Sequence, residues 1–127
     1  MKLPPYADLL GLTVAGHENG APILTMPFGD GVMGRPGFLH GGAIGGLLEM
    51  AAIAALHAAF DDDDRPRIKP INVTVDYMRG GREAETFALG VVTRLGTRVA
   101  NLEAHAWQED RSKPIAAARM NVLLRRG

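Results

Sequence analysis

A long apolar stretch, from Gly41 to Ala59, constrains the fold of this chain more than any other feature. On a helix of 3.6 residues per turn, its apolar side chains cover nearly the whole circumference and leave no polar stripe for solvent. Such a helix must be enclosed by the rest of the fold. The stretch also contains two pairs of glycines, each glycine weakening a helix by about 1 kcal/mol relative to alanine, and one carboxylate, Glu49. Both features need an explanation beyond packing.

Glu49 has two possible explanations. An ionised carboxylate that is buried without a partner costs several kcal/mol. It is therefore either a structural residue, bonded to a backbone N–H or an arginine, or a catalytic one. The glycines favour catalysis, because a glycine-rich helix start presents free N–H groups and the positive end of the helix dipole, which suit an oxyanion. A carboxylate and an oxyanion site are the minimum needed to hydrolyse an acyl bond.

The spacing of these groups adds a condition. Gly41 and Glu49 are about 12 Å apart along a helix that rises 1.5 Å per residue, so one substrate carbonyl cannot contact both. If they act together, two copies of the helix must lie side by side in opposite directions around a two-fold axis. The sequence therefore predicts at least a dimer.

The remainder of the chain predicts strands around this helix. Asn19-Gly20 is a strong hairpin signal, and Ile71, Val73, Val75 and Tyr77 alternate with polar residues as in a strand with one solvated face. Glycines and Pro36 predict an irregular loop at 29–37. We expect a helical turn at 4–10, the long helix at 41–59, and strands at 12–16, 22–28, 71–77, 84–95, 98–110 and 114–124. One long helix with about six mostly antiparallel strands is an α+β fold.

Composition narrows the class of protein. The length of 127 residues fits a single domain, residues 1–127. Acidic and basic residues balance at 14 each, which does not favour a nucleic-acid partner. The chain has no cysteine, as is common in a reducing compartment. We find no signal peptide and no membrane-spanning pattern, and we expect a cytoplasmic protein.

No group of residues predicts a metal site. His17, His57 and His105 lack the spacing of zinc ligands. The run Asp61–Asp64 lacks the spaced ligands and the glycine of a calcium loop, so a solvated loop is expected. Trp107, on a predicted strand, is expected to pack rather than to bind substrate.

Three segments resemble the hotdog-fold acyl-CoA thioesterases of the phenylacetic-acid-degradation (PaaI-like) and 4-hydroxybenzoyl-CoA thioesterase group. They are GFLHGGAIGGLLEMAAIAAL, INVTVDYMRG and TRLGTRVANLEAHAWQED. The resemblance covers roughly residues 5–124, and its most specific part is Leu-His-Gly-Gly with an acid nine residues after the histidine. It implies a long central helix wrapped by a curved antiparallel sheet. It also implies a homodimer with active sites at the subunit interface, often paired into a homotetramer.

The resemblance also implies roles for individual residues. Gly41 supplies the backbone N–H that binds the oxyanion, Glu49 acts as nucleophile or general base, and His40 orders the loop and the thioester end of the substrate. Gly42 and Gly34 are expected to contact the substrate. The family often has Asn or Gln where this chain has Gly34. Some relatives have Ser or Thr at the position of Ile53, or Ser at that of Pro70, and these departures leave efficiency and substrate choice open.

Three arginines are candidates for binding the phosphates of coenzyme A, because guanidinium pairs well with phosphate: Arg79, Arg94 and Arg98. Coenzyme A would be part of the substrate, and no metal or other cofactor is expected. The apolar residues Phe38, Leu39, Met50 and Tyr77 suit aromatic and short- or medium-chain acyl groups equally.

The leading prediction is hydrolysis of an acyl-CoA to free acid and CoA. Two alternatives stay open. One is a hotdog dehydratase or hydratase acting on acyl-CoA or acyl carrier protein, although His40 lies too near the helix start to match its catalytic histidine. The other is a non-catalytic hotdog protein that binds acyl-CoA.

Overall fold

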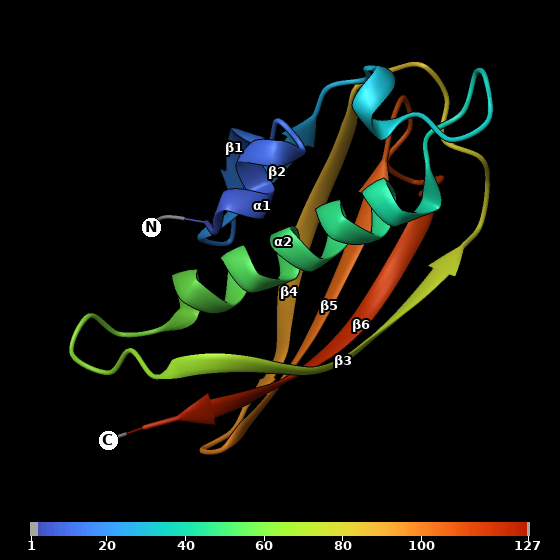
Figure 1. Cartoon of the computed structure of the whole chain (residues 1–127). Coiled ribbons are helices and arrows are strands. Elements are labelled where there is room, and N and C mark those ends of the chain that lie inside the picture. Colours follow the sequence, from blue (N-terminus) through green and yellow to red (C-terminus); the bar gives the residue numbers. More distant parts are fainter. Residues whose placement is uncertain (1–2, 127) are drawn as a thin grey trace.

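A six-stranded antiparallel sheet curves around one long helix in the computed structural model, which describes residues 3–126 (Figure 1). The strands follow the order β1-β2-β4-β5-β6-β3 across the sheet, and every neighbouring pair is antiparallel. The predicted α+β hotdog architecture is confirmed. The elements are α1 (Pro5–Leu9), β1 (Thr13–Glu18), β2 (Ala21–Met26), the 3-10 turn η1 (Asp30–Val32), α2 (Gly41–Ala59), β3 (Arg67–Tyr77), β4 (Thr86–Leu95), β5 (Val99–Trp107) and β6 (Ala116–Arg125).

Two expectations about local structure are wrong. The sequence predicts that the strand starts at residue 71, but β3 begins at Arg67. The additional residues belong to the strand because they pair with the end of β6. Pro70 is tolerated there because β3 is an edge strand, and the register shifts between Pro70 and Asn72. The loop 29–37 is not wholly irregular, because it contains η1.

Helix α2 lies across the inner face of the sheet and forms most of the core. Leu47, Leu48 and Leu56 are completely buried. The helix approaches β4 closely at Gly90 of that strand, and a Cβ there would come 2.8 Å from the Cα of Ala52. Only glycine leaves room for this approach. By length and composition α2 could cross a membrane, but 67% of that window is buried inside the fold, as is typical of a core helix. The predicted enclosure of α2 is therefore confirmed for most of its circumference.

The inner face of β3 is covered by α2 only in part. The register places Val73, Val75 and Tyr77 on the same sheet face as the helix, opposite the buried Met120 and Ala118 and the buried Ala116 of β6. However, α2 packs mainly against β4, β5 and β2, and Val73 and Tyr77 are 40% and 55% exposed. The alternation at 71–77 predicts that one face of this strand is buried, but in the single chain that face stays largely exposed. The outer edge of β3 pairs with no strand among residues 3–126.

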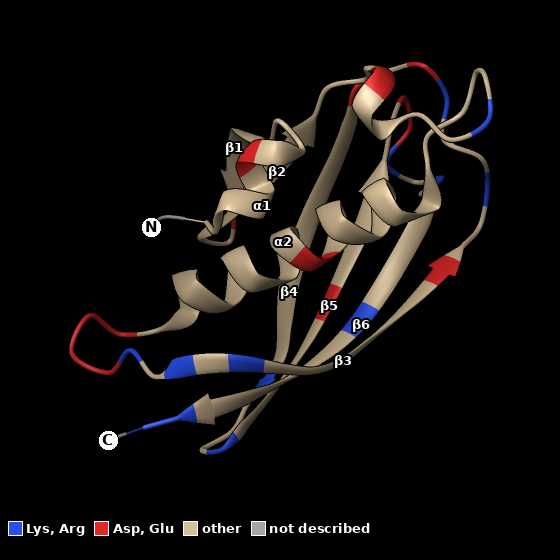
Figure 2. Ribbon diagram, in the orientation of Figure 1, with Lys and Arg blue, Asp and Glu red and all other residues tan. Residues whose placement is uncertain are grey.

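Charged residues gather where α2 is joined to β3 (Figure 2). The loop Asp61–Asp64 is exposed, which confirms that it is solvated. Two of its carboxylates pair with arginines, Asp62 with Arg65 at 3.5 Å and Asp64 with Arg126 at 3.1 Å. These pairs lie at the surface and contribute little to stability.

Candidate active site

His40 is the N-cap residue of α2. Its backbone is extended, and its Nδ1 accepts a hydrogen bond of 2.9 Å from the N–H of Gly42. Because Nδ1 accepts, we assign the proton of the neutral ring to Nε2. A Cβ at residue 42 would come 3.0 Å from the imidazole, so any larger residue would have to push the capping ring aside. His40 thus orders the helix start, and it occupies the N–H of Gly42.

The N–H of Gly41 is free. It donates to no group among residues 3–126, whereas the next N–H groups of the first turn donate to His40, either through Nδ1 or through its carbonyl oxygen. The carbonyl oxygen of Gly41 accepts a hydrogen bond of 2.8 Å from the hydroxyl of Tyr77. A free N–H at the positive end of a helix dipole suits a developing oxyanion.

Glu49 lies on the same side of α2 as Gly41 and Gly45, because residues four apart on a helix are neighbours on its surface. All three residues are half-buried, although those before and after Glu49 are buried. The expectation that Glu49 is fully buried is therefore wrong for the single chain. Its carboxylate forms no salt bridge and no hydrogen bond within residues 3–126. Neither of the structural roles considered for it, bonding to an arginine or to a backbone N–H, is present in the described part of the chain.

The loop before α2 explains why residue 34 is glycine. The N–H of Gly34 donates to the carbonyl oxygen of Phe38 at 2.9 Å, which turns the loop back onto the helix start. A Cβ at residue 34 would come 3.1 Å from the Cα of His40. A larger side chain would have to displace the backbone of the capping residue, so this chain has a steric reason for lacking a polar side chain here.

The three arginines proposed for coenzyme A lie at two different ends of the sheet. Arg79 follows β3, beside the start of α2, and its N–H donates to the carbonyl oxygen of Ile115 at 3.2 Å. Arg94 is near the end of β4 and Arg98 lies in the β4–β5 turn, at the opposite end of the sheet (Figure 1). Within one chain, Arg79 lies at the end of the sheet where Tyr77 bonds to Gly41, whereas Arg94 and Arg98 lie at the other end.

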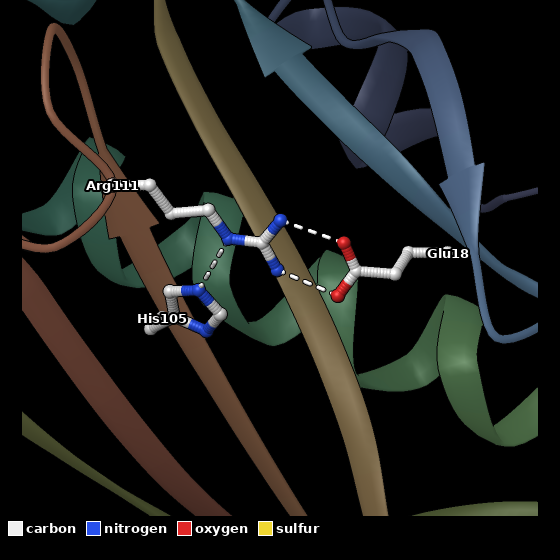
Figure 3. Close-up of polar contacts among 3 residues, drawn as sticks. All are labelled: Glu18, His105 and Arg111. Atoms are coloured by element: carbon white, nitrogen blue, oxygen red, sulfur yellow. Dashed lines mark hydrogen bonds and ion pairs between the residues drawn. The ribbon is translucent and has the colours of Figure 1, made fainter.

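A second polar cluster lies on the sheet face turned away from α2 (Figure 3). Arg111 donates two parallel hydrogen bonds to the carboxylate of Glu18, at 2.7 and 2.8 Å, and its Nε donates to Nε2 of His105 at 3.4 Å. The hydrogen bond from Arg111 holds the pKa of Glu18 below its usual value, and burial lowers the pKa of His105. Arg111 also covers Trp107, which is buried, as its predicted packing role requires. The cluster joins β1 to the β5–β6 loop.

The fold and the capped helix start are those of a hotdog protein. The sequence matches the family model of the thioesterase superfamily over residues 36–115. The chain therefore belongs to the thioesterase superfamily. No curated protein matches it.

Solved structures share the fold of this chain. A protein from Chromobacterium violaceum is 36% identical, with 97% of this chain and 84% of that chain covered and a TM-score of 0.74. A phenylacetic acid degradation-related protein from Ralstonia eutropha is 19% identical, with coverage of 97% and 92% and a TM-score of 0.80. A thioesterase from Haemophilus influenzae is 18% identical, with coverage of 94% and 81% and a TM-score of 0.81. The last two likenesses show the fold alone, and the family match supports thioester hydrolysis as the general reaction.

Proposed function

We propose that this protein hydrolyses an acyl-CoA to a free acid and CoA, at a site shared between two subunits. The observation that carries the proposal is the half-buried stripe of Gly41, Gly45 and Glu49, which lies along α2 on the side where the inner face of β3 is covered only in part. The stripe ends in a free N–H at one end and an unpaired carboxylate at the other. Family membership supports the reaction class.

Gly45 is the midpoint of this stripe. Gly41 and Glu49 each lie four residues from it, which is about 6 Å along a helix. A second copy of α2, antiparallel to the first across an axis near Gly45, would bring the N–H of Gly41 to Glu49 of the partner subunit. A residue without a side chain at the axis permits close approach of two helices.

Strand β3 supports the same axis. A Cβ at Gly45 would lie 3.5 Å from the hydroxyl of Tyr77 and 3.8 Å from Cγ2 of Val75. The helix stripe therefore lies beside the C-terminal end of β3. Antiparallel pairing of two β3 edges would join the sheets, and the partner's helix would cover Val73 and Tyr77. Exposed apolar edge strands are usually paired or covered. A homodimer is thus the proposed active species, and its pairing into a homotetramer is proposed from the family resemblance.

The proposed chemistry needs only these groups and water. The N–H of Gly41 and the helix dipole stabilise negative charge on the thioester oxygen, a donor effect worth about 10²- to 10³-fold in rate. Glu49 of the partner subunit either takes a proton from the attacking water or attacks the carbonyl carbon itself, giving an anhydride that water then hydrolyses. In both routes the C–S bond breaks, the CoA sulfur leaves and is protonated, and water supplies the new oxygen of the acid. The proposed acyl groups are aromatic or short- to medium-chain, and the proposed location is the cytoplasm.

One observation favours a second candidate, a non-catalytic protein that binds acyl-CoA. The backbone of His40 leaves little room for a side chain at Gly34, so a polar group that orients water or substrate is missing there. The dehydratase alternative gains no such support, because the imidazole of His40 is engaged through Nδ1 in capping α2.

Glu49→Gln tests the proposal. The substitution keeps the size of the side chain but removes its charge, so kcat should fall by about 10²-fold or more. The free energy of unfolding should change by less than about 1 kcal/mol, because no partner of Glu49 is lost. We would measure thiol release from a panel of acyl-CoA substrates and thermal unfolding of the same samples.

Glu103→Gln is the matched control, because Glu103 is exposed on β5 and lies far from α2 on the other sheet face. It should retain wild-type turnover. Full activity in a destabilised Glu49→Gln protein would end the catalytic assignment of Glu49. Binding of acyl-CoA by the wild type without thiol release on any substrate would favour the non-catalytic candidate.

A further inference from the structure

Two arginines from different loops converge on one aromatic ring next to the helix start. The guanidinium carbon of Arg35 lies 4.0 Å from the centroid of the Phe38 ring, and that of Arg82 lies 4.6 Å from it. Arg35 and Phe38 belong to the loop before α2, whereas Arg82 belongs to the loop between β3 and β4. The ring is half-buried and packs on Gly80, where a Cβ would come 2.9 Å from it. Phe38 therefore contacts both arginines and brings their guanidinium groups together.

The two positive charges in this cluster are not neutralised by a salt bridge. Both guanidinium groups contact the same ring, so they lie within about one Debye length of each other, roughly 10 Å at 0.1 M salt, and they repel. Among residues 3–126, no carboxylate lies within 4.0 Å of Arg35 or Arg82. Stacking on an aromatic ring attracts a cation without removing its charge. Both arginines are exposed, so their N–H groups are available to an anion.

The position of the cluster relates it to the proposed active site. Phe38 precedes Gly41 by three residues, a span of at most about 11 Å. Arg82 also lines a cavity of about 240 Å³, where Arg79 and Lys113 add positive charge and Glu109 and Asp110 add negative charge. The basic residues of this lining exceed the acidic ones by one. If the bound anion is part of the substrate, it is a group that lies at some distance from the reacting carbonyl. Guanidinium groups bind phosphate in a planar, two-point geometry.

We propose that Arg35 and Arg82, brought together by Phe38, bind the phosphates of the coenzyme A nucleotide. The inference rests on the proposed function, because it names the part of the acyl-CoA that these residues recognise. It can nevertheless be tested without catalysis, since the nucleotide alone should bind. The competing explanation is that the cluster only fastens the two loops together.

The test measures binding of adenosine 3′-phosphate 5′-diphosphate by isothermal titration calorimetry to the wild type, Arg35→Ala, Arg82→Ala and Arg119→Ala. Arg119 is the matched control, because it is exposed on β6 between the buried Ala118 and Met120 and so faces away from α2. Each cluster variant should bind about tenfold more weakly or worse, as expected for a lost charge-assisted contact. Arg119→Ala should match the wild type, and added salt should reduce the difference.

Arg35→Lys controls for the possibility that truncation to alanine disturbs the loop. It keeps one positive charge but loses the two-point geometry, so its affinity should fall between those of the wild type and Arg35→Ala. Wild-type affinity in both alanine variants would overturn the proposal, as would an equal loss in Arg119→Ala. If the nucleotide binding behaves as expected but no acyl-CoA is hydrolysed, the nucleotide site stands and the proposed hydrolysis fails.

Discussion

Replacing Gly45 by leucine tests whether two copies of α2 meet at this residue. Within one chain a Cβ at this residue is tolerated, because it would lie 3.5 Å from the hydroxyl of Tyr77 and 3.8 Å from Cγ2 of Val75, both ordinary contact distances. The further carbons of leucine would have to turn away from Tyr77, toward the side where the proposed partner lies. Leucine also favours a helix over glycine by about 0.8 kcal/mol. With the side chain turned away from Tyr77, the isolated chain should keep about the stability of the wild type.

In the proposed dimer the same change is unfavourable, because the two leucines would meet at the axis. Overpacking of a well-packed contact costs about 1–3 kcal/mol per site, so two copies would cost about 2–6 kcal/mol. Since about 1.4 kcal/mol changes an equilibrium constant tenfold, the dissociation constant of the dimer should rise by roughly 30- to 10⁴-fold. The variant should then be monomeric at concentrations where the wild type is dimeric.

Sedimentation velocity over a range of concentrations measures this shift, and thermal unfolding and thioesterase assays on the same samples complete the test. Activity should be lost together with the dimer, while the fold is retained. Ala58→Leu is the control, because Ala58 is exposed in the last turn of α2 and points to a different side of the helix. A Gly45→Leu dimer of wild-type affinity, or a monomer with full activity, would refute the shared site.

Three further changes test other parts of the structure. Gly90→Ala should lower the melting temperature by several degrees, because its Cβ would collide with the backbone carbonyl of Ala51 and neither backbone can move freely; unchanged melting would show that the helix can shift. Arg111 lowers the pKa of Glu18, so the stability that the pair contributes is present at neutral pH and lost as the pH falls through that lowered pKa. The difference in urea unfolding between wild type and Arg111→Leu should therefore shrink from neutral pH to about pH 3, and a constant difference would contradict the pairing. Arg79→Ala should raise KM for acyl-CoA and leave kcat for a short thioester without the nucleotide nearly unchanged, whereas equal losses on both substrates would indicate a structural role.

The parts of the fold that follow from local signals were predictable. The helix expected at 41–59 matches α2, because its apolar residues and its capping histidine are close in sequence. The turn at Asn19-Gly20 is also confirmed, with φ angles of 52° and 83° that favour asparagine and glycine. Strand alternation and turn residues gave the number of strands correctly, because each strand carries its own pattern.

The parts that depend on distant contacts were not predictable. Glu18 and Arg111 are 93 residues apart, and neither has a local pattern that names the other. The contacts of Arg35 and Arg82 with the Phe38 ring likewise form only where two distant loops meet. The start of β3 at Arg67 was missed because charged residues and a proline are unusual in a central strand, but an edge strand tolerates them.

Sequence periodicity identifies residues that avoid water, but it does not identify what covers them. The alternation of Val73, Val75 and Tyr77 correctly predicts one apolar face, and yet this chain leaves much of that face exposed beside α2. The same holds for Glu49 on the adjoining helix stripe, because the sequence predicts that it is buried and the single chain leaves it half-buried. If a second subunit supplies the missing cover, dimer formation buries the apolar face of β3 and completes the catalytic pair in one step. Activity per chain should then depend on protein concentration near the dissociation constant of the dimer, and it should be lost on dilution before the chain unfolds.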